Sequence, residues 1–323
     1  MKSIKIEKFG GPEVLKIQDI EMGKPGPKEV IIKNNSIGLN FIDIYHRTGL
    51  YPIPLPSGIG LEACGQIEEV GSEVSLFKIG DRVTHASMPI GAYSEKQIMP
   101  EEKLILVPDG ISDEVASCIT LKGITAEYLL HRAYPLKKGD KILYHAAAGG
   151  LGQILCPWAN ALGAEVIGTV GSKAKEEIAK KNGCHHVINY SEKNFVKEVE
   201  KIVGKDGIDV VYDGVGAKTF KGSIETLKIR GMMVAFGNAS GYVDTLDIKK
   251  DINAKGLFFT RPSIAHYTVK REELVESAKK VFDAILTKKF TVEISKKYSL
   301  KDTAQAHKDL EARLLTGPAV IIP

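Results

Sequence analysis

The chain has 323 residues, of which 43% are apolar and 26% are charged, and these fractions are ordinary for a globular protein. At about 150 residues per domain, this length predicts two domains. The net charge of +4 is mild and the lysines are scattered, so the charge pattern gives no support to a nucleic-acid or anionic-membrane surface.

The N-terminus and the cysteines indicate a compartment. The chain enters an apolar segment at residues 4–6 without a secretory leader, and no apolar run approaches the roughly 20 residues of a membrane span. The four cysteines stand far apart at positions 64, 118, 156 and 184 and form no C-x-x-C pair. Such spacing is typical of buried thiols in a reducing environment. The sequence therefore predicts a cytoplasmic protein without a membrane anchor.

Residues 1 to about 120 have the texture of a β domain. Short alternating strands, such as those expected at residues 29–33 and 65–71, are separated by turns rich in glycine and proline. This pattern predicts an antiparallel, barrel-like domain.

A glycine-rich turn follows the apolar strand expected at residues 142–144, and an apolar helix is expected at 153–162. The turn is a variant of the G-x-G-x-x-G fingerprint in which Ala146 takes the first glycine position. Backbone N–H groups at such a helix start face an anion. We therefore expect Gly149, Gly150 and Leu151 to bind a dinucleotide. Pro157 predicts a kink or a shorter helix, because it removes a backbone hydrogen bond.

Strands and helices then alternate. Strands are expected at residues 165–170, 186–189, 208–212 and 231–236, and helices at 173–182, about 192–203 and 216–227. Alternation of this kind implies right-handed crossovers and a parallel sheet covered on both faces. The sequence predicts an α/β, doubly wound (Rossmann) dinucleotide-binding domain.

The end of the second of these strands indicates which dinucleotide binds. NAD enzymes usually place an Asp or Glu there to hold the ribose 2′-OH, but the first carboxylate in this chain is Glu176. Gly171, Ser172, Lys173 and Lys175 stand there instead, and their hydroxyl and ammonium groups suit the 2′-phosphate of NADPH. The alternative is an ordinary helix start in which Ser172 is only the N-cap.

The C-terminal part contributes a helix at 271–286, a segment at 300–314 and a strand at 319–322. The last strand is most economically paired with the N-terminal β domain. We therefore expect a catalytic domain formed by residues 1–123 and 264–323, with the dinucleotide domain, residues 124–263, inserted in it.

Ordered motifs along nearly the whole chain carry a family resemblance. They lie at residues 10–15, 38–45, 47–52, 56–60, 80–83, 122–125, 146–152, 188–190, 211–216, 236–238 and 260–263. Through them the chain resembles the medium-chain dehydrogenases/reductases, specifically the bacterial quinone oxidoreductases of the zeta-crystallin type. The resemblance implies that the β domain is GroES-like.

The resemblance also sorts zinc enzymes from zinc-free ones. In related zinc alcohol dehydrogenases a cysteine stands where this chain has Asn40, and a histidine stands where it has Leu61. An amide and an isobutyl group are unsuited to Zn²⁺, and the eight histidines show no metal-ligand spacing. We expect a zinc-independent enzyme with no metal.

Without zinc, the acceptor should already be electron-poor, with the nicotinamide carrying the chemistry. The resemblance implies oxidation of NADPH by a small quinone. Two alternatives stay open: an NADPH-dependent reductase of enones or other α,β-unsaturated carbonyls, and a non-catalytic NADPH-binding protein, crystallin-like or RNA-binding. The lack of a basic cluster and of an aromatic-basic RNA motif disfavours nucleic acid.

The resemblance assigns further residues. Tyr45 and Tyr51 are substrate-pocket candidates, since a tyrosine can stack on a flat ring and donate a hydrogen bond. The other candidates for cofactor binding are Asn40, Phe41, Ile42, Asp43, Tyr45, Thr125, Tyr128, Tyr190, Phe236, Gly237, Asn238, Pro262, Ser263 and Arg313. Lys122 has two interpretations, a cofactor contact or a partner for a carboxylate. A homodimer is also implied, with residues 246–259 supplying edge-strand material.

Overall fold

The computed structural model describes all residues from Met1 to Pro323. They form two compact units. The first comprises Met1–Lys122, Thr268–Phe282 and Val292–Pro323, and the second comprises Gly123–Tyr267 and Asp283–Thr291.

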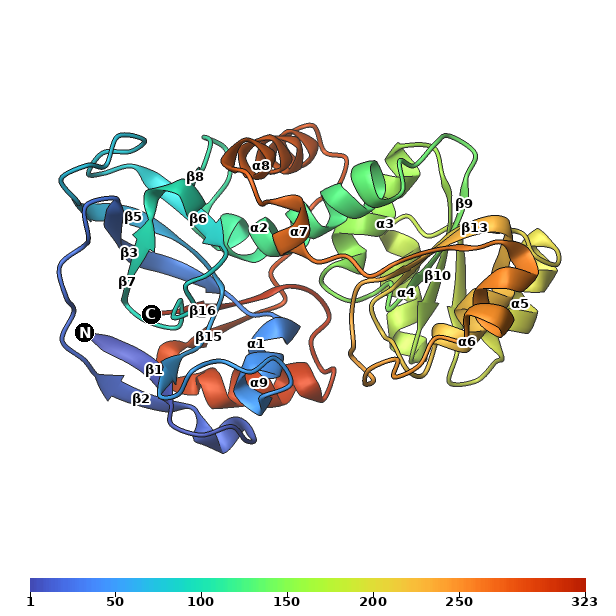
Figure 1. Cartoon of the computed structure of the whole chain (residues 1–323), viewed down its shortest axis with the longest axis horizontal. Helices are drawn as coiled ribbons and strands as arrows, with labels where there is room; N and C mark the ends of the chain where they lie inside the picture. The colour runs from blue at the N-terminus through green and yellow to red at the C-terminus, as the bar shows by residue number, and fades with distance from the viewer. The chain divides into compact units, whose positions relative to one another are not determined.

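The first unit is built on two β-sheets (Figure 1). In the smaller sheet, β1 (Lys2–Ile6) lies between β2 (Lys16–Asp19) and β4 (Ser57–Gly58), and both pairings are antiparallel. The larger sheet contains β3 (Glu29–Gly38), β5 (Glu62–Val70), β6 (Arg82–Ala86), β7 (Lys96–Pro100), β8 (Ile105–Leu106), β15 (Lys296–Ser299) and β16 (Ala319–Ile322). Their order is β15-β16-β3-β5-β6-β8, with β7 also paired to β3.

The C-terminal strand joins this sheet as the sequence predicts. In the antiparallel pair of β16 and β3, Val320 lies opposite Gly38 and Ile321 lies opposite Ile37. Ile37 and Ile321 are fully buried in the same apolar core. Burial of these β-branched side chains fixes the register, because a shift by one residue would turn them to the other face.

Two helices of this unit lie together, α1 (Phe41–Thr48) and α9 (Thr303–Glu311) (Figure 1). The Asp43 carboxylate accepts a hydrogen bond from the backbone N–H of Asn40, which satisfies one donor at the start of α1. Gly49 ends the helix with a left-handed φ of 79°. Short 3-10 turns are η1 (Pro12–Val14), η2 (Glu101–Lys103) and η6 (Leu300–Asp302). The chain passes from one unit to the other four times: within α2 (Asp113–Tyr128), after Tyr267, within α8 (Arg271–Leu286) and after Thr291.

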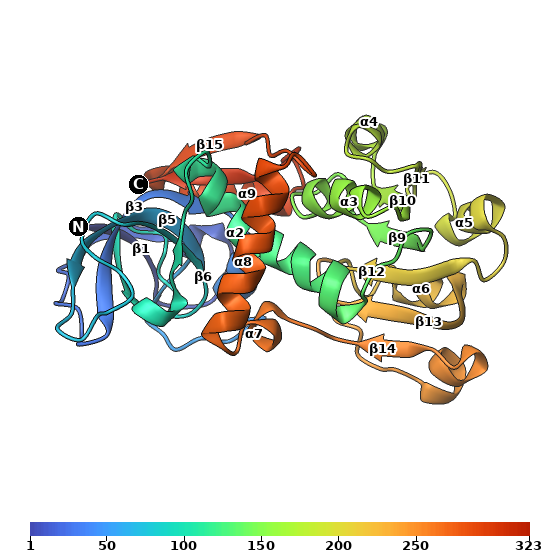
Figure 2. The same cartoon turned by 90° about the horizontal axis from the view of Figure 1, so that it is seen from above.

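The second unit contains one parallel sheet. Its strands are β9 (Lys141–His145), β10 (Glu165–Val170), β11 (His186–Asn189), β12 (Ile208–Asp213), β13 (Leu227–Ala235) and β14 (Phe258–Thr260). Figure 2 shows them side by side in the order β11-β10-β9-β12-β13-β14. The helical elements are α3 (Gly152–Ala161), α4 (Lys173–Lys181), α5 (Phe195–Val203), α6 (Phe220–Thr226), α7 (Ile264–Tyr267), η3 (Leu129–Ala133), η4 (Ile248–Ile252) and η5 (Asn253–Lys255).

This strand order is that of the doubly wound dinucleotide fold, with β9 first in sequence and at the centre. The order reverses between β9 and β12, and ligands of such sheets bind at that point, beyond the carboxyl ends of the strands. In β10, residues Val166 to Val170 are all buried, as expected for a parallel strand covered on both faces. The predicted fold class is confirmed.

Two local predictions differ from the structure. The helix expected at 216–227 is only α6, because Gly216 has a φ of 90° and its N–H, like that of Val215, donates to the Asp213 carboxylate. Of the expected strand material at 246–259, only Phe258 and Phe259 belong to a strand; Asp247 caps the η4 turn instead. Of the two outcomes expected from Pro157, a shortened helix is not observed, since α3 spans Gly152–Ala161. None of the helices combines the length and apolar character needed to cross a bilayer.

Candidate active site

In the second unit, the predicted cofactor residues gather at one edge of the sheet. The groups follow successive parallel strands: Gly149, Gly150 and Leu151 after β9; Gly171, Ser172, Lys173 and Lys175 after β10; Tyr190 after β11; Phe236, Gly237 and Asn238 after β13; Pro262 and Ser263 after β14. Because the carboxyl ends of parallel strands share an edge, the fold brings these groups to the edge where dinucleotides bind.

The glycine turn has the close backbone packing that its sequence predicts. Ala146 adopts a left-handed φ of 62°, and the N–H of Gly149 donates to its carbonyl oxygen at 2.8 Å. A Cβ atom at Gly152 would lie 2.4 Å from the carbonyl oxygen of Ala147. Only glycine fits there, so α3 begins directly over the turn. The positive end of its dipole is then presented to an anion.

The end of β10 fits a 2′-phosphate. Ser172 stands at the N-cap of α4, yet its hydroxyl makes no capping hydrogen bond. Tyr190 packs over Gly171, where a Cβ would lie 2.7 Å from the tyrosine oxygen. Glu176, the first carboxylate after the strand, accepts a hydrogen bond from Asn189 Nδ2 at 3.2 Å. Hydroxyl and ammonium groups therefore follow β10, and the first carboxylate after the strand already has a partner.

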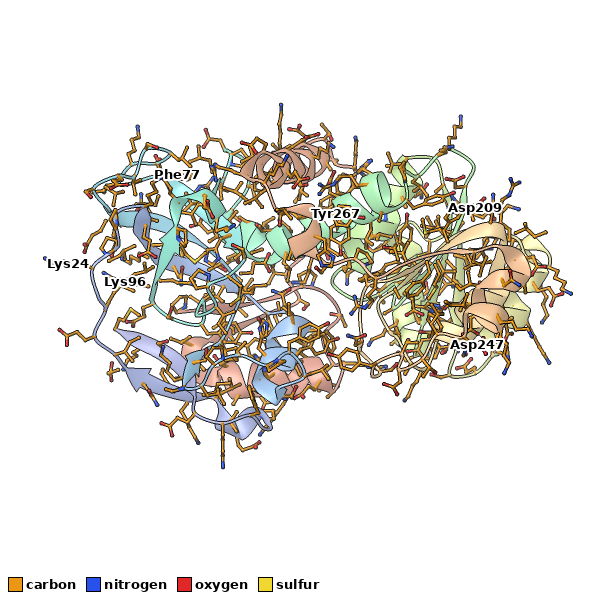
Figure 3. The ribbon with its side chains drawn as sticks, viewed as in Figure 1. Lys24, Phe77, Lys96, Asp209, Asp247 and Tyr267 are labelled. Atoms are coloured by element: carbon orange, nitrogen blue, oxygen red, sulfur yellow. The ribbon has the colours of Figure 1, made fainter.

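The remaining candidates of this unit are mostly packed side chains. The Tyr128 ring is buried and stacks on Tyr267, labelled in Figure 3, with centroids 4.5 Å apart and planes 7° apart. Burial raises the pKa of the Tyr128 phenol, which keeps it protonated. Thr125 lies one turn before it in α2 and is half-buried. Phe236 stacks on Tyr144 at 6.3 Å.

A buried polar network at the end of β12 was not predicted. Asp213 accepts hydrogen bonds from Thr219 Oγ1 at 2.7 Å and Ser223 Oγ at 3.0 Å. Ser223 in turn meets His145 Nε2 at 2.9 Å, and His145 Nδ1 meets Thr169 Oγ1 at 2.8 Å. The network joins α6 to β12, β9 and β10 and so holds the ligand edge rigid.

In the first unit, Asn40 is the N-cap of α1, and the candidates Phe41, Ile42, Asp43 and Tyr45 lie within the helix. The rings of Tyr45 and Tyr51 meet edge to face, with centroids 5.1 Å apart, and Phe41 lies 6.5 Å from Tyr45. All three aromatic side chains are half-buried, so α1 and the residues that follow it offer an aromatic surface. Arg313 is exposed on the turn after α9, with a φ of 58°.

Asn40 belongs to a buried cluster with Glu62 and Lys122. Its Nδ2 donates to Glu62 Oε2 at 2.8 Å, and its Oδ1 accepts from Lys122 Nζ at 2.6 Å. Lys122 Nζ lies 3.9 Å from Glu62 Oε2. Burial raises the pKa of Glu62, while the lysine charge lowers it. Of the two interpretations of Lys122, the structure shows the carboxylate partner, and Glu62 itself was missed from the sequence.

A second buried chain of hydrogen bonds runs from α1 to α9. Arg47 Nη1, which can only donate, lies 3.2 Å from His307 Nδ1, so His307 carries its proton on Nε2. That nitrogen lies 3.1 Å from Tyr93 Oη, and Tyr93 donates to Asp43 Oδ2 at 2.8 Å. Arg47 also pairs with Glu311 at 2.6 Å. Each donor direction is thereby determined.

Burial shifts the pKa values of Asp43 and His307, two members of this chain of hydrogen bonds, in opposite directions. It raises the pKa of Asp43 to about 7, although the hydrogen bond from Tyr93 opposes the rise. Burial, together with the Arg47 charge, lowers the pKa of His307 to about 3. At neutral pH His307 is therefore neutral.

We expect His307→Gln to remove a pH dependence of stability. Below its ordinary pKa of about 6.5 the unfolded state binds one more proton at His307 than the folded state does, so this residue makes stability rise with pH. The free energy of unfolding of the wild type relative to the variant should rise by up to about 1.4 kcal/mol per pH unit between about pH 4 and about pH 6. Urea unfolding across this range measures it. If the free energies of unfolding of the wild type and the variant changed equally with pH, His307 would not be a buried neutral imidazole.

Within the structure, no group of three or more His, Cys, Asp or Glu side chains is arranged to hold a metal ion. Asn40 and Leu61 stand at the positions that the resemblance assigns to zinc ligands in related alcohol dehydrogenases. Asn40 is hydrogen-bonded to Lys122, and Leu61 is buried.

Known proteins resemble this chain over its whole length. The chain matches the alcohol dehydrogenase GroES-like domain over residues 26–138 and the zinc-binding dehydrogenase family over residues 150–285. The chain therefore belongs to the medium-chain dehydrogenases/reductases. Within that family it is 45% identical to a quinone oxidoreductase of Pseudomonas aeruginosa, covering 100% of this chain and 99% of the relative. It is 44% identical to a 2-haloacrylate reductase of Burkholderia sp, covering 98% of each.

A solved structure agrees with this assignment. The crystal structure of Escherichia coli quinone oxidoreductase complexed with NADPH superposes with a TM-score of 0.97 at 44% identity, covering 100% of both chains. The predicted family and its inserted Rossmann domain are confirmed.

Proposed function

We propose that this chain is an NADPH:quinone oxidoreductase that works without a metal. The observation that carries the cofactor is the end of β10, where Ser172 and two lysines replace the carboxylate that NADH requires. Support for the acceptor comes from the full-length similarity to quinone oxidoreductases of Pseudomonas aeruginosa and Escherichia coli, the latter solved with NADPH.

NADPH, when bound, supplies the hydride. The chain's own residues bind and orient the reactants. Amides at Gly149, Gly150 and Leu151 would hold the pyrophosphate, and Ser172, Lys173, Lys175, Gly171 and Tyr190 the 2′-phosphate. The nicotinamide half would be held by Asn40, Phe41, Ile42, Asp43, Tyr45, Thr125, Tyr128, Phe236, Gly237, Asn238, Pro262, Ser263 and Arg313. Tyr45 and Tyr51 would line the quinone pocket, where their edge-to-face pair offers an aromatic wall.

A second acceptor class has specific support. The relative from Burkholderia sp is a 2-haloacrylate reductase, and a haloacrylate is a conjugated, electron-poor alkene. Reduction of enones is therefore the alternative activity of the same site.

The decisive experiment is NADPH consumption scanned across quinones, enones and alcohols. We expect turnover with quinones and little with alcohols. Tight NADPH binding with no oxidation by any acceptor would instead indicate a non-catalytic, crystallin-like protein.

Metal content is a separate prediction. Because the Asn40 amide is already bonded to Lys122 and Glu62 and Leu61 offers no ligand atom, we expect no stoichiometric zinc and no loss of quinone reduction with a chelator. Elemental analysis of the purified protein measures this. One tightly held Zn²⁺ per chain would overturn the zinc-independent assignment and reopen alcohol oxidation.

The edge of the parallel sheet offers a surface for a homodimer. β14 is the edge strand of its sheet, and Phe258 and Phe259 on it are 58% and 38% exposed. Pairing of β14 with that of a second copy would give a homodimer, which sedimentation would reveal as twice the chain mass.

Four free, buried cysteines support a reducing cytoplasm. The proposed domain boundaries remain 1–123 with 264–323, and 124–263.

A further inference from the structure

The second unit contains a cavity at the edge of its sheet opposite the edge where dinucleotides bind. Its volume is about 560 Å³, which lies within the range of sites that hold small molecules. Lining residues 204–206 precede β12, and the lining residues Glu225 and Thr226 precede β13. These are the amino ends of two parallel strands, so the cavity is separate from the candidate cofactor site.

Two helices that pack together form the apolar part of this cavity. α5 lies against α6 (Figure 1), and a Cβ atom at Gly222 would lie 2.5 Å from Cζ of Phe195. Val196 and Val199 of α5 and Ile224 of α6 line the cavity. Val199 and Ile224 are buried members of the apolar core of this unit. A ligand therefore contacts hydrocarbon there, and its binding needs an apolar body.

Several charged groups of the cavity already have partners. Lys255 Nζ donates to Asp206 Oδ1 at 2.6 Å and to two carbonyl oxygens at the C-terminal end of α6, each at 2.8 Å. These bonds use all three N–H donors of the ammonium. Asp251 accepts two hydrogen bonds from Lys221, at 2.6 and 2.7 Å. These pairs neutralise one another within the protein, so the other charged residues determine which ligand charge fits.

The lining has an excess of negative charge. Its residues carry four carboxylates and three ammonium groups, and adding the ion-pair partners that lie outside the cavity, one lysine and one aspartate, leaves the same excess of one. The carboxylates of Glu200 and Glu225 are exposed and unpaired, in the last turns of α5 and α6. Carboxylates are disfavoured at helix C-termini, and Lys205 is the only unpaired cation of the lining. A ligand with a single positive charge would balance this cavity.

We propose that this cavity is a second ligand site, which takes a protonated amine with an apolar body. Its ammonium pairs with Glu200 and Glu225, and its hydrocarbon or aromatic part packs on Val196, Val199 and Ile224. An anion would meet the excess negative charge, an uncharged molecule would leave both carboxylates unpaired, and an inorganic cation would leave the apolar wall in water. The proposal is independent of the reductase function, because no residue of the candidate cofactor site takes part.

Three dansyl probes that differ in charge test the proposal. At neutral pH dansylcadaverine carries one ammonium, N-pentyl dansylamide is uncharged, and dansylglycine carries one carboxylate; dansyl emission rises when the ring enters an apolar site. Titration of the full chain should give a Kd for dansylcadaverine about tenfold lower than for the uncharged probe, and weaker binding still for dansylglycine. Added salt should weaken dansylcadaverine binding, and saturating NADPH should not displace it.

Surface variants locate the bound probe. Glu200→Gln and Glu225→Gln should each weaken dansylcadaverine about threefold and leave the uncharged probe unchanged. Ile229→Ser, at an exposed apolar residue of the lining, should weaken both probes. Glu198→Gln is the matched control, because Glu198 lies on the same helix as Glu200 but pairs with Lys201 at 2.6 Å; it should change neither affinity. Equal affinity for all three probes, dansylcadaverine binding that neither cavity glutamate affects, or displacement of dansylcadaverine by NADPH would overturn the proposal.

Discussion

Gly150→Asp should abolish NADPH binding while leaving the fold intact. Gly150 directly precedes Leu151, the N-cap of α3, at the edge where the pyrophosphate must approach the backbone. A carboxylate there places a negative charge against the phosphates and takes the anion site for itself. An uncompensated charge of this kind costs about 3 kcal/mol or more, so Kd should rise at least about a hundredfold. Quenching or enhancement of NADPH fluorescence measures the change.

Two controls separate the causes. Gly150→Asn adds the same bulk without charge and should weaken binding less than Gly150→Asp. Gly23→Asp adds the same charge at a glycine whose Cβ would meet nothing within 4 Å, and should leave Kd unchanged. A folded Gly150→Asp protein with wild-type affinity would place the phosphate site elsewhere.

The dinucleotide unit could be predicted from sequence because its signals are local. The β-branched strand at Glu165–Val170 and the strand at His186–Asn189 were bounded to the residue. Errors arose where a side chain redirected the backbone. Asp213 accepts the N–H groups of Val215 and Gly216, and this turn delays α6, which periodicity alone does not reveal.

The buried clusters of the first unit could not be predicted, because their members are distant in sequence. Arg47 and His307 are 260 residues apart, and Glu62 and Leu121 are 59 apart. Each residue alone reads as an ordinary polar side chain. The one available signal was that Asn40 and Leu61 offer no zinc ligand. It does not reveal that Glu62 and Lys122 bond to Asn40, because only the fold brings these three residues together.

The second prediction with a large effect is a preference for NADPH over NADH. Hydrogen bonds that involve a charged group contribute roughly 1.5–3 kcal/mol each. Ser172, Lys175 and Tyr190 gather at the end of β10, and Glu176 is held by Asn189. Even if solvent exposure halves each contribution, two or three contacts to a 2′-phosphate should favour NADPH over NADH by roughly tenfold to a thousandfold. The ratio of kcat/KM for the two cofactors measures this preference, and equal use of both would contradict the assignment of this corner.

Lys175→Ala then tests which group the lysine contacts. It should raise KM for NADPH and leave KM for NADH almost unchanged, since NADH lacks the phosphate. Lys180→Ala is the matched control, because Lys180 lies in the last turn of the same helix and pairs with Glu177 at 2.9 Å; it should change neither value. All measurements need one ionic strength, because salt screens such contacts. If Lys175→Ala impaired NADH and NADPH alike, the lysine would be supporting the fold or the pyrophosphate, and the preference would have to come from Ser172 and Tyr190.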